Sequence, residues 1–224
     1  MIKPYYEEEN ITIYNGDCLE VMKEFDNESI DCVIADPPYG LNYLSNRYKY
    51  GNPHLKIEND DKLFIPIVSL WQKLKTTGAM YVFYSHKLPL VSDNIKNVII
   101  WVKNNWSAGD LEGDYGNQYE MLAFMPKGNF KLKSKRFSNV WFFDREIPKY
   151  HPTQKPTSLI NRIIESATNK GDIILDPFLG SGTTARACKD LGRKCIGIEI
   201  SKEYCDIAVK RLGQEVFDFA EVNR

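Results

Sequence analysis

The chain has 224 residues, of which 43% are hydrophobic and 26% are charged, an ordinary globular composition. This length suffices for one large α/β domain or for two small ones with a buried core. The 29 Lys and Arg residues and the 30 Asp and Glu residues give a formal net charge of -1, which by itself does not favour a polyanionic partner.

No apolar stretch approaches the length that spans a bilayer, and the N-terminal residues are acidic and polar, unlike a signal peptide. We therefore expect an intracellular protein without a membrane partner. The five cysteines form no C-x-x-C pair. This pattern predicts reduced thiols, mostly in the core, and neither a disulfide framework nor a metal site.

In chain order, apolar runs alternate with segments of helical period, which predicts a parallel sheet covered by helices. The predicted strands are Ile11–Tyr14, Ser29–Ala35, Ala79–Tyr84, Asn97–Val102, Tyr119–Met125, Asp172–Leu175 and Lys194–Ile198. The predicted helices are Cys18–Phe25, Lys62–Lys75, His86–Asn94, Thr157–Thr168, Thr183–Leu191 and Lys202–Leu212. The helix that starts at Thr157 carries one apolar stripe, which we expect to pack on the sheet.

Two long segments interrupt this alternation. Gly40–Asp61 is rich in Tyr, Asn and Lys, and Pro126–Tyr150 is basic and aromatic. Loops of this length in a compact domain are more often functional than not. We therefore expect both segments to contribute to a binding surface.

The strand Ser29–Ala35 runs directly into Asp36-Pro37-Pro38-Tyr39. The two prolines fix the local backbone and remove two N–H donors. The Asp36 carboxylate and the neighbouring carbonyls can then face a pocket as acceptors only. Such a pocket suits an amino group.

A glycine-rich segment, Asp176 to Thr184, joins the strand Asp172–Leu175 to the next helix. Glycines there let the backbone approach a ligand, and free amide groups lie at the helix start. The segment lacks the lysine of a phosphate-binding P-loop, so a non-phosphorylated adenosine ligand is preferred. Glu199 ends the following strand, where a carboxylate can accept hydrogen bonds from both ribose hydroxyls; alternatively, it is a solvated acid.

Together, the Asp36 tetrapeptide and the Phe178-x-Gly180-x-Gly182 loop resemble the hallmark pair of S-adenosylmethionine-dependent DNA amino-methyltransferases. The tetrapeptide comes first in the chain, as in the circularly permuted β class of that family. The resemblance implies one Rossmann-like domain over residues 1–224. It also implies a mostly parallel seven-stranded sheet with an antiparallel strand, in which the N-terminal strand lies beside the one that ends at Glu199.

Further residues match the family. Asp17 stands where the family carries an acidic residue that binds the adenine of the cofactor, although it could instead cap a helix. His151 to Pro156 is similar to the H-P-T-x-K-P segment that contacts the methionine end of the cofactor, with Lys155 as the carboxylate partner; His151 could instead be a turn residue. The cofactor residues that the resemblance implies are Asp17, His151, Thr153, Lys155, Asp176, Phe178, Gly180, Ser181, Gly182, Thr183 and Glu199.

The implied catalytic residues are Asp36, Pro37, Pro38 and Tyr39. Asp36 and the Pro37 carbonyl would accept the two hydrogens of an exocyclic base amine. Tyr39 would stack on a base flipped out of the duplex, or it is plain core. In the family, Asp at the first motif position leans to adenine N6, and cytosine N4 is the alternative.

Local charge supports duplex DNA as the partner. Five cations and no acid lie between Lys127 and Arg136, where the β class inserts its target-recognition region. We therefore expect this basic segment to lie beside the cleft and residues 126–150 to form a small target-recognition insertion. Residues 40–61 form a second loop beside the tetrapeptide. The predicted DNA-binding residues are Arg47, Lys49, Lys127, Lys131, Lys133, Lys135 and Arg136.

Other interpretations stay open. Related tetrapeptides occur in methyltransferases for RNA or protein amides, and a catalytically silent relative would bind DNA or the cofactor without turnover. A dinucleotide-dependent oxidoreductase is disfavoured because the third glycine is missing. The expected enzyme is bacterial or phage-encoded and cytoplasmic. A homodimer, a restriction-enzyme partner and the recognition sequence are left open.

Overall fold

One mixed β-sheet runs through the computed structural model, which describes residues 2–38, 65–86, 89–106, 112–113, 115–146 and 154–213. The strands are β1 (Tyr6–Glu8), β2 (Ile11–Asn15), β3 (Ile30–Ala35), β4 (Leu74–Tyr84), β5 (Asn97–Val102), β6 (Tyr119–Pro126), β7 (Val140–Phe142), β8 (Ile173–Asp176) and β9 (Lys194–Glu199). The helices are α1 (Cys18–Met22), α2 (Ile67–Lys73), α3 (Thr157–Ala167), α4 (Thr183–Leu191) and α5 (Lys202–Leu212).

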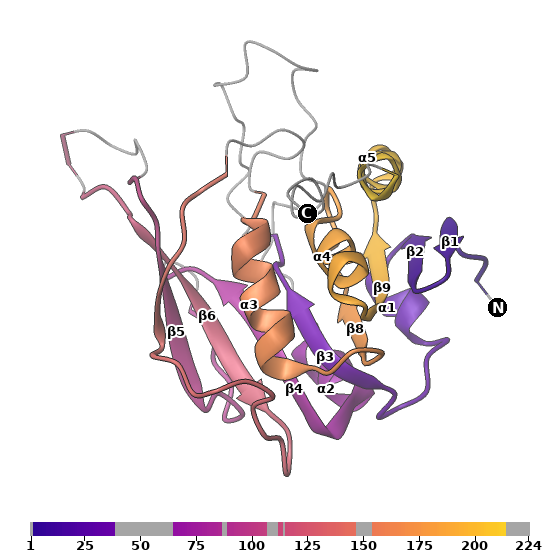
Figure 1. The fold of residues 1–224 in the computed structure, drawn as a ribbon, viewed down its shortest axis with the longest axis horizontal. Coiled ribbons are helices and arrows are strands. Elements are labelled where there is room, and N and C mark those ends of the chain that lie inside the picture. Colours follow the sequence, from indigo (N-terminus) through magenta and orange to yellow (C-terminus); the bar gives the residue numbers. More distant parts are fainter. Residues whose placement is uncertain are drawn as a thin grey trace, which may run out of the picture.

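The strand order in the sheet is β1-β2-β9-β8-β3-β4-β6-β5-β7 (Figure 1). The five strands from β2 to β4 in this order are parallel, whereas β6 is antiparallel to both of its neighbours and β1 is antiparallel to β2. Parallel strands are covered on both faces, which explains why β3 and β8 are nearly continuous apolar runs. The α/β class and the mostly parallel sheet are thus as the sequence predicts.

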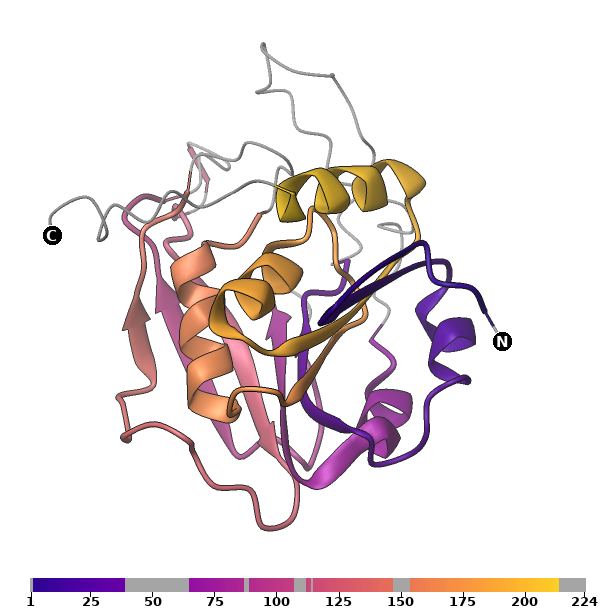
Figure 2. The same cartoon turned by 45° about the vertical axis from the view of Figure 1, so that its right-hand side comes forward.

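Segments from the two ends of the described chain lie side by side. Strand β2 pairs in parallel with β9, with Ile13 opposite Gly197, as the sequence predicts. The hydroxyl of Tyr5 also donates a hydrogen bond to Asp206 on α5. Figure 2 shows the N-terminal hairpin in indigo next to the yellow helix α5. In the sheet, β9, the last strand along the chain, is therefore hydrogen-bonded directly to β2, the second strand along the chain.

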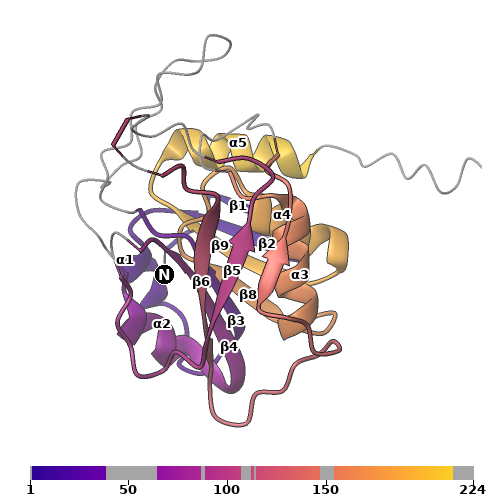
Figure 3. The ribbon, with the colours of Figure 1, turned by 90° about the vertical axis from the view of Figure 1, so that its left-hand side faces the viewer.

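Helices cover both faces of the sheet. Figure 3 shows α3 and α4 on one face and α1 and α2 on the other. Helix α5 belongs to the same core cluster as α3 and α4. The apolar stripe of α3 is buried in the first of these layers, where Leu159 and Ile163 are fully inaccessible. Val21 of α1 and Leu70 of α2 belong to the core of the opposite face. All five cysteines are buried as well, and none of the described helices is long and apolar enough to span a membrane.

The structure departs from several predicted elements. Helix α1 ends at Met22, where the sequence predicts a helix that continues to Phe25. Its described residues form nine strands where the sequence predicts seven. The two additional strands, β1 and β7, have three residues each, too few to show a periodic pattern. The predicted helix His86–Asn94 is wrong: its described residues 86 and 89–94 form no helix. Of the predicted helix Lys62–Lys75, residues 62–64 lie outside the described residues, and α2 covers only Ile67–Lys73. It ends there because Leu74 pairs with Ile30 and begins β4, earlier than the predicted strand start at Ala79.

Packing of α3 on the sheet generates the first testable prediction. Ile163→Ala removes a fully buried side chain, so we expect the free energy of unfolding to fall by about 2–5 kcal/mol. Glu165→Ala on the exposed side of the same helix is the control, with an expected change within about 0.5 kcal/mol. Urea denaturation measures both variants, and equal losses would contradict the assigned packing.

Candidate active site

An open cavity lies at the carboxyl ends of the parallel strands, where β3 and β8 are neighbours. The chain continues from β3 to β4 on one side and from β8 to β9 on the other. Ligands of open α/β sheets bind at such a switch point, because the loops part there and leave a crevice. The predicted site residues that line the cavity are Asp17, Asp36, Pro38, Lys155, Asp176, Phe178, Gly180, Ser181, Thr183 and Glu199. Pro37 and Gly182 do not line it.

The glycine loop wraps the end of β8 before α4 begins. Gly180 and Gly182 have φ angles of 53° and 81°, in the left-handed region that favours glycine. A Cβ atom on Gly182 would lie 2.7 Å from the Cβ of Ala208 on α5. The loop therefore needs glycine at position 182 for its backbone angle and also for its close packing on α5.

Glu199 ties this loop to the start of α5. Its Oε2 accepts a hydrogen bond from the Gly180 N–H at 2.7 Å, and its Oε1 accepts one from the Ser201 N–H at 2.8 Å. These two hydrogen bonds fix the orientation of the carboxylate. The carboxylate stands in the cavity wall, where the sequence predicts it.

Asp176 is a second carboxylate in the cavity, and only 5% of its surface is exposed. Burial raises its pKa to about 7, and the nearby charges of Asp36 and Glu199 act in the same direction. Hydrogen bonds from Thr184 and from the Phe178 N–H, at 3.0 Å, oppose this rise. The three carboxylates make the cavity a favourable place for a cationic ligand.

Asp36 pairs with Lys155, although the two residues are far apart in the sequence. The Lys155 Nζ lies 2.6 Å from Asp36 Oδ2 and 3.3 Å from Glu120 Oε2. Burial by itself lowers the pKa of Lys155, but the charges of Asp36 and Glu120 outweigh it and hold the pKa above its ordinary value. The structure thus gives Lys155 carboxylate partners within the protein, where the resemblance implies the carboxylate of the cofactor.

Asp17 takes the capping role that the sequence leaves open. Its Oδ1 accepts hydrogen bonds from the N–H groups of Leu19, at 2.8 Å, and Glu20, at 3.2 Å, at the start of α1. These bonds satisfy two of the amide donors that a helix start leaves without partners. Asp17 also borders the cavity, so a contact with a ligand is compatible with its capping role.

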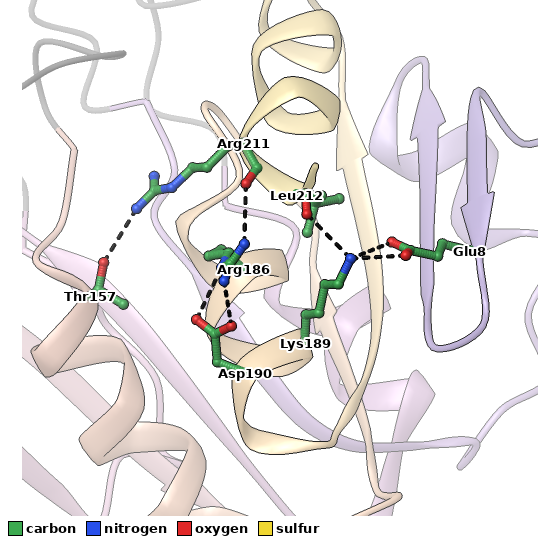
Figure 4. A network of polar contacts seen from close by, with 7 residues as sticks. All are labelled: Glu8, Thr157, Arg186, Lys189, Asp190, Arg211 and Leu212. Carbon is green, nitrogen blue, oxygen red and sulfur yellow. Dashed lines mark hydrogen bonds and ion pairs between the residues drawn. The ribbon is translucent and has the colours of Figure 1, made fainter. Parts of the chain in front are cut away.

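Arg211 of α5 connects the two helices that begin at the cavity. Its guanidinium donates to the hydroxyl of Thr183 at 2.8 Å and to the hydroxyl of Thr157 at 3.2 Å. Figure 4 shows this contact with Thr157 and, beside it, the pairs Arg186 with Asp190 and Lys189 with Glu8. Arg211 therefore holds the start of α4 in place relative to the start of α3.

The basic segment does not flank the cavity, so that expectation is wrong. The Lys127 ammonium donates to the carbonyls of Trp71, at 3.0 Å, and Leu74, at 2.6 Å, where β4 begins. The Lys133 N–H donates to the carbonyl of Ser166, near the end of α3. These contacts place the segment at the amino ends of the parallel strands, opposite the cavity (Figure 1). The physical reason is that β6 is antiparallel, so the chain leaves it at that edge. The exposed cations of the segment are Lys131, Lys133, Lys135 and Arg136.

Five predicted site residues lie outside the described part of the chain. They are Tyr39, Arg47, Lys49, His151 and Thr153. In contrast, sequence reasoning missed Glu120 and Arg211. Glu120 is a single acid in an otherwise apolar strand, which is a usable signal, whereas nothing local distinguishes Arg211 from the other cations of its helix.

A doubly wound sheet with a glycine loop at its switch point and an acid at the end of the next strand defines a Rossmann-like fold that binds a nucleotide-type cofactor. The DNA methylase family matches residues 30–210. The chain belongs to this family.

Named relatives agree with this assignment. DNA adenine methyltransferase YhdJ of Escherichia coli is 34% identical over 90% of this chain and 82% of its own length. The type II methyltransferase M2.DpnII of Streptococcus pneumoniae is 30% identical over 96% of this chain and 94% of its own. M.HinfI of Haemophilus influenzae is 32% identical over 90% of this chain and 68% of its own.

Solved structures share the fold. The crystal structure of the M1.HpyAVI-SAM complex superimposes with a TM-score of 0.70 at 32% identity, covering 90% of this chain and all of that chain. The cytosine-N4-specific PvuII DNA methyltransferase gives a TM-score of 0.73 at 20% identity, covering 98% of this chain and 92% of that one. At 20% identity, the similarity to the PvuII enzyme shows a shared fold and no more.

The glycine loop generates a prediction with a matched control. Gly182→Ala adds left-handed strain and a clash with Ala208, whereas Gly171→Ala, at a φ of 84°, adds strain with no neighbour within 4 Å. We expect Gly171→Ala to lower the free energy of unfolding by about 1–2 kcal/mol. The clash should cost Gly182→Ala roughly 1–3 kcal/mol more. Chemical denaturation measures both, and equal losses would show that the contact with α5 is not tight.

The raised pKa of Asp176 generates a prediction on pH and stability. The pKa is about 7 in the folded protein and near 4 in the unfolded chain, so the stability contributed by neutral Asp176 is lost as the pH rises through 7. Asp176→Asn stays neutral. As the pH rises from about 4 to about 8, we therefore expect the free energy of unfolding of the variant to increase by roughly 1–3 kcal/mol relative to that of the wild type.

Urea denaturation across this pH range measures the difference. Asp144→Asn, at an exposed carboxylate, is the control and should show no such trend. If the free energies of unfolding of Asp176→Asn and the wild type differed by the same amount at every pH, the raised pKa of Asp176 would be contradicted.

Proposed function

We propose that this chain transfers the methyl group of S-adenosylmethionine to the exocyclic N6 amine of adenine in duplex DNA. One observation carries the proposal: the acceptor Asp36 and the glycine loop with Glu199 meet in one cavity. Membership of the DNA methylase family, the adenine specificity in the name of YhdJ and the S-adenosylmethionine in the M1.HpyAVI complex support it.

The residues of the cavity suit this cofactor. S-adenosylmethionine supplies an electrophilic methyl group and is cationic at its sulfonium and its ammonium, which fits a cavity walled by three carboxylates. We assign the ribose hydroxyls to Glu199 and the ammonium to Asp176. The backbone from Gly180 to Thr183 approaches the ligand, and Asp17 accepts a hydrogen bond from the adenine amino group of the cofactor. His151, Thr153 and Phe178 remain predicted contacts of the same cofactor.

Asp36 supplies the chemistry on the side of the base. The lone pair of an exocyclic amine is delocalised into the ring, so the amine is a weak nucleophile unless an acceptor polarises its N–H bonds. Asp36 accepts one N–H hydrogen, and positioning with electrostatic preorganisation supplies most of the rate enhancement. A bond forms between the nitrogen and the methyl carbon, the electron pair of the C–S bond returns to sulfur, and the excess proton of the methylated nitrogen passes to water.

Two parts of the catalytic tetrapeptide stay predictions. Pro37 is buried and does not line the cavity, so its carbonyl is a predicted second acceptor only. Tyr39, which lies outside the described residues, is the predicted stacking partner of a base flipped out of the duplex. Flipping is needed because the target amine is otherwise stacked inside the helix.

We also propose that residues 1–224 form one circularly permuted methyltransferase domain. The pairing of β2 with β9 supports this, because it supplies at the N-terminus the strand that would otherwise follow α5. Residues 40–61 are then the loop on the catalytic side. A cytoplasmic enzyme, bacterial or phage-encoded, stays the expectation. The homodimer and the pairing with a restriction enzyme stay open, and light scattering tests the first of them.

Asp36→Asn tests the proposed function. The variant keeps the shape of the side chain but loses the anionic acceptor, so we expect transfer of labelled methyl to duplex DNA to fall at least about 100-fold. Binding of S-adenosylmethionine, measured by calorimetry, should change little. Asp31→Asn, at the other end of β3, is the control and should retain transfer.

Mass spectrometry of the digested product separates the alternatives. N6-methyladenine is the expected product, whereas N4-methylcytosine would overturn the assigned base. Transfer by Asp36→Asn at the wild-type rate would overturn the assigned mechanism. A wild-type chain that methylates RNA or a protein amide but not DNA would overturn the proposed substrate.

A further inference from the structure

Four side chains of alternating charge form a continuous row that ends in the cavity. Lys103, directly after β5, lies 2.7 Å from Glu120 of β6. Glu120 lies 3.3 Å from Lys155, and Lys155 lies 2.6 Å from Asp36. We call these four residues the charge row. The carboxylate proposed to bind the target amine is therefore the last member of a connected set.

Lys155 is the most confined member of the charge row. Its side chain is 7% exposed, against 25% for each of the two carboxylates that it contacts. Its ammonium also stands 4.8 Å from the centre of the Phe83 ring, at the end of β4. A buried ammonium is stable only when it is well paired, so its position depends on both carboxylates.

Asp36 would be a poor anion in this cavity without that ammonium. The charged groups near it include Lys155, which contacts it, and Asp176. Glu120 contacts the same ammonium, Lys103 contacts Glu120, and Glu199 acts on Asp176. Apart from the two lysines these charges are negative, and a cluster of like charges favours protonation. A protonated Asp36 would donate one hydrogen bond toward the amine and would be a much weaker acceptor.

We propose that Lys155 and Glu120 are positioning residues for Asp36: Lys155 holds the carboxylate ionised and aimed, and Glu120 fixes Lys155 in that place. This inference rests on the proposed function, because it explains how Asp36 meets the target amine. It replaces the role of cofactor carboxylate partner that the resemblance gives to Lys155. Glu120 lies in β6, outside the tetrapeptide, the glycine loop and the segment that precedes α3, so those motifs assign it no role.

Lys155→Met is the first test, with single-turnover transfer to duplex DNA measured against pH at saturating cofactor. Loss of the adjacent ammonium raises the pKa of Asp36, so we expect the acid limb of the profile to move up by about one to three pH units. The dissociation constant of S-adenosylmethionine should stay within about threefold. A large loss of cofactor affinity with an unmoved acid limb would overturn the inference and return Lys155 to the cofactor.

Glu120→Gln is the second test, and it acts on the position of Lys155. It removes one of the two carboxylates that pair with the ammonium but keeps the shape of the side chain. We expect the single-turnover rate of transfer to fall at least about 10-fold while the dissociation constant of the cofactor is unchanged, and Glu120→Asp to restore part of the rate. Should Lys155→Met fail to fold, this pair decides: transfer by Glu120→Gln at the wild-type rate overturns the inference.

Lys75→Met is the matched control. Lys75 pairs with Asp31 at 2.7 Å, an ion pair of the same type between β4 and β3 but at the edge opposite the cavity. The pH profile of Lys75→Met should match that of the wild type, since a loss of stability alone does not move the acid limb. A wild-type chain without transfer to DNA would overturn the proposed function, whereas an active Lys155→Met with an unmoved profile overturns this inference alone.

Discussion

The gathering of three carboxylates in one cavity wall, at one edge of the sheet, is the constraint on which the site depends. Asp36, Asp176 and Glu199 follow or end β3, β8 and β9, which are adjacent and parallel, so the sheet itself gathers them. Each is accommodated differently: Asp36 pairs with Lys155, Glu199 accepts two backbone N–H groups, and burial favours the neutral form of Asp176. The acidic character that remains suits a cationic cofactor.

The doubly wound topology explains why so few residues can build this site. The chain leaves β3 and β8 in opposite directions, so a crevice opens between two loops that are far apart in the sequence. Helices α3 and α4 both begin at this crevice, and Arg211 of α5 links their first turns. A cofactor and a target amine can therefore meet on a rigid frame, which positioning catalysis requires.

Local signals predicted most of the fold. The bounds of β5, α4 and α5 match the prediction, because apolar periodicity and glycine caps mark them directly. Strands β1 and β7 are too short for any period to show. The predicted helix at His86–Asn94 failed, and the helix before β4 is shorter than predicted, because strand pairing with β3 decides where β4 begins. The glycine loop, Asp36 and Glu199 were found because each follows a recognisable strand.

The sequence by itself determined the class of fold, the two motifs and the strand ends that carry them, since these depend on residues that are neighbours in the chain. Tertiary structure alone decided that Lys155 pairs with Asp36 and Glu120, and that the basic segment lies at the edge opposite the cavity. The physical reason is that ion pairs depend on distances between strands. Those distances follow from strand order and direction, which residue composition does not specify.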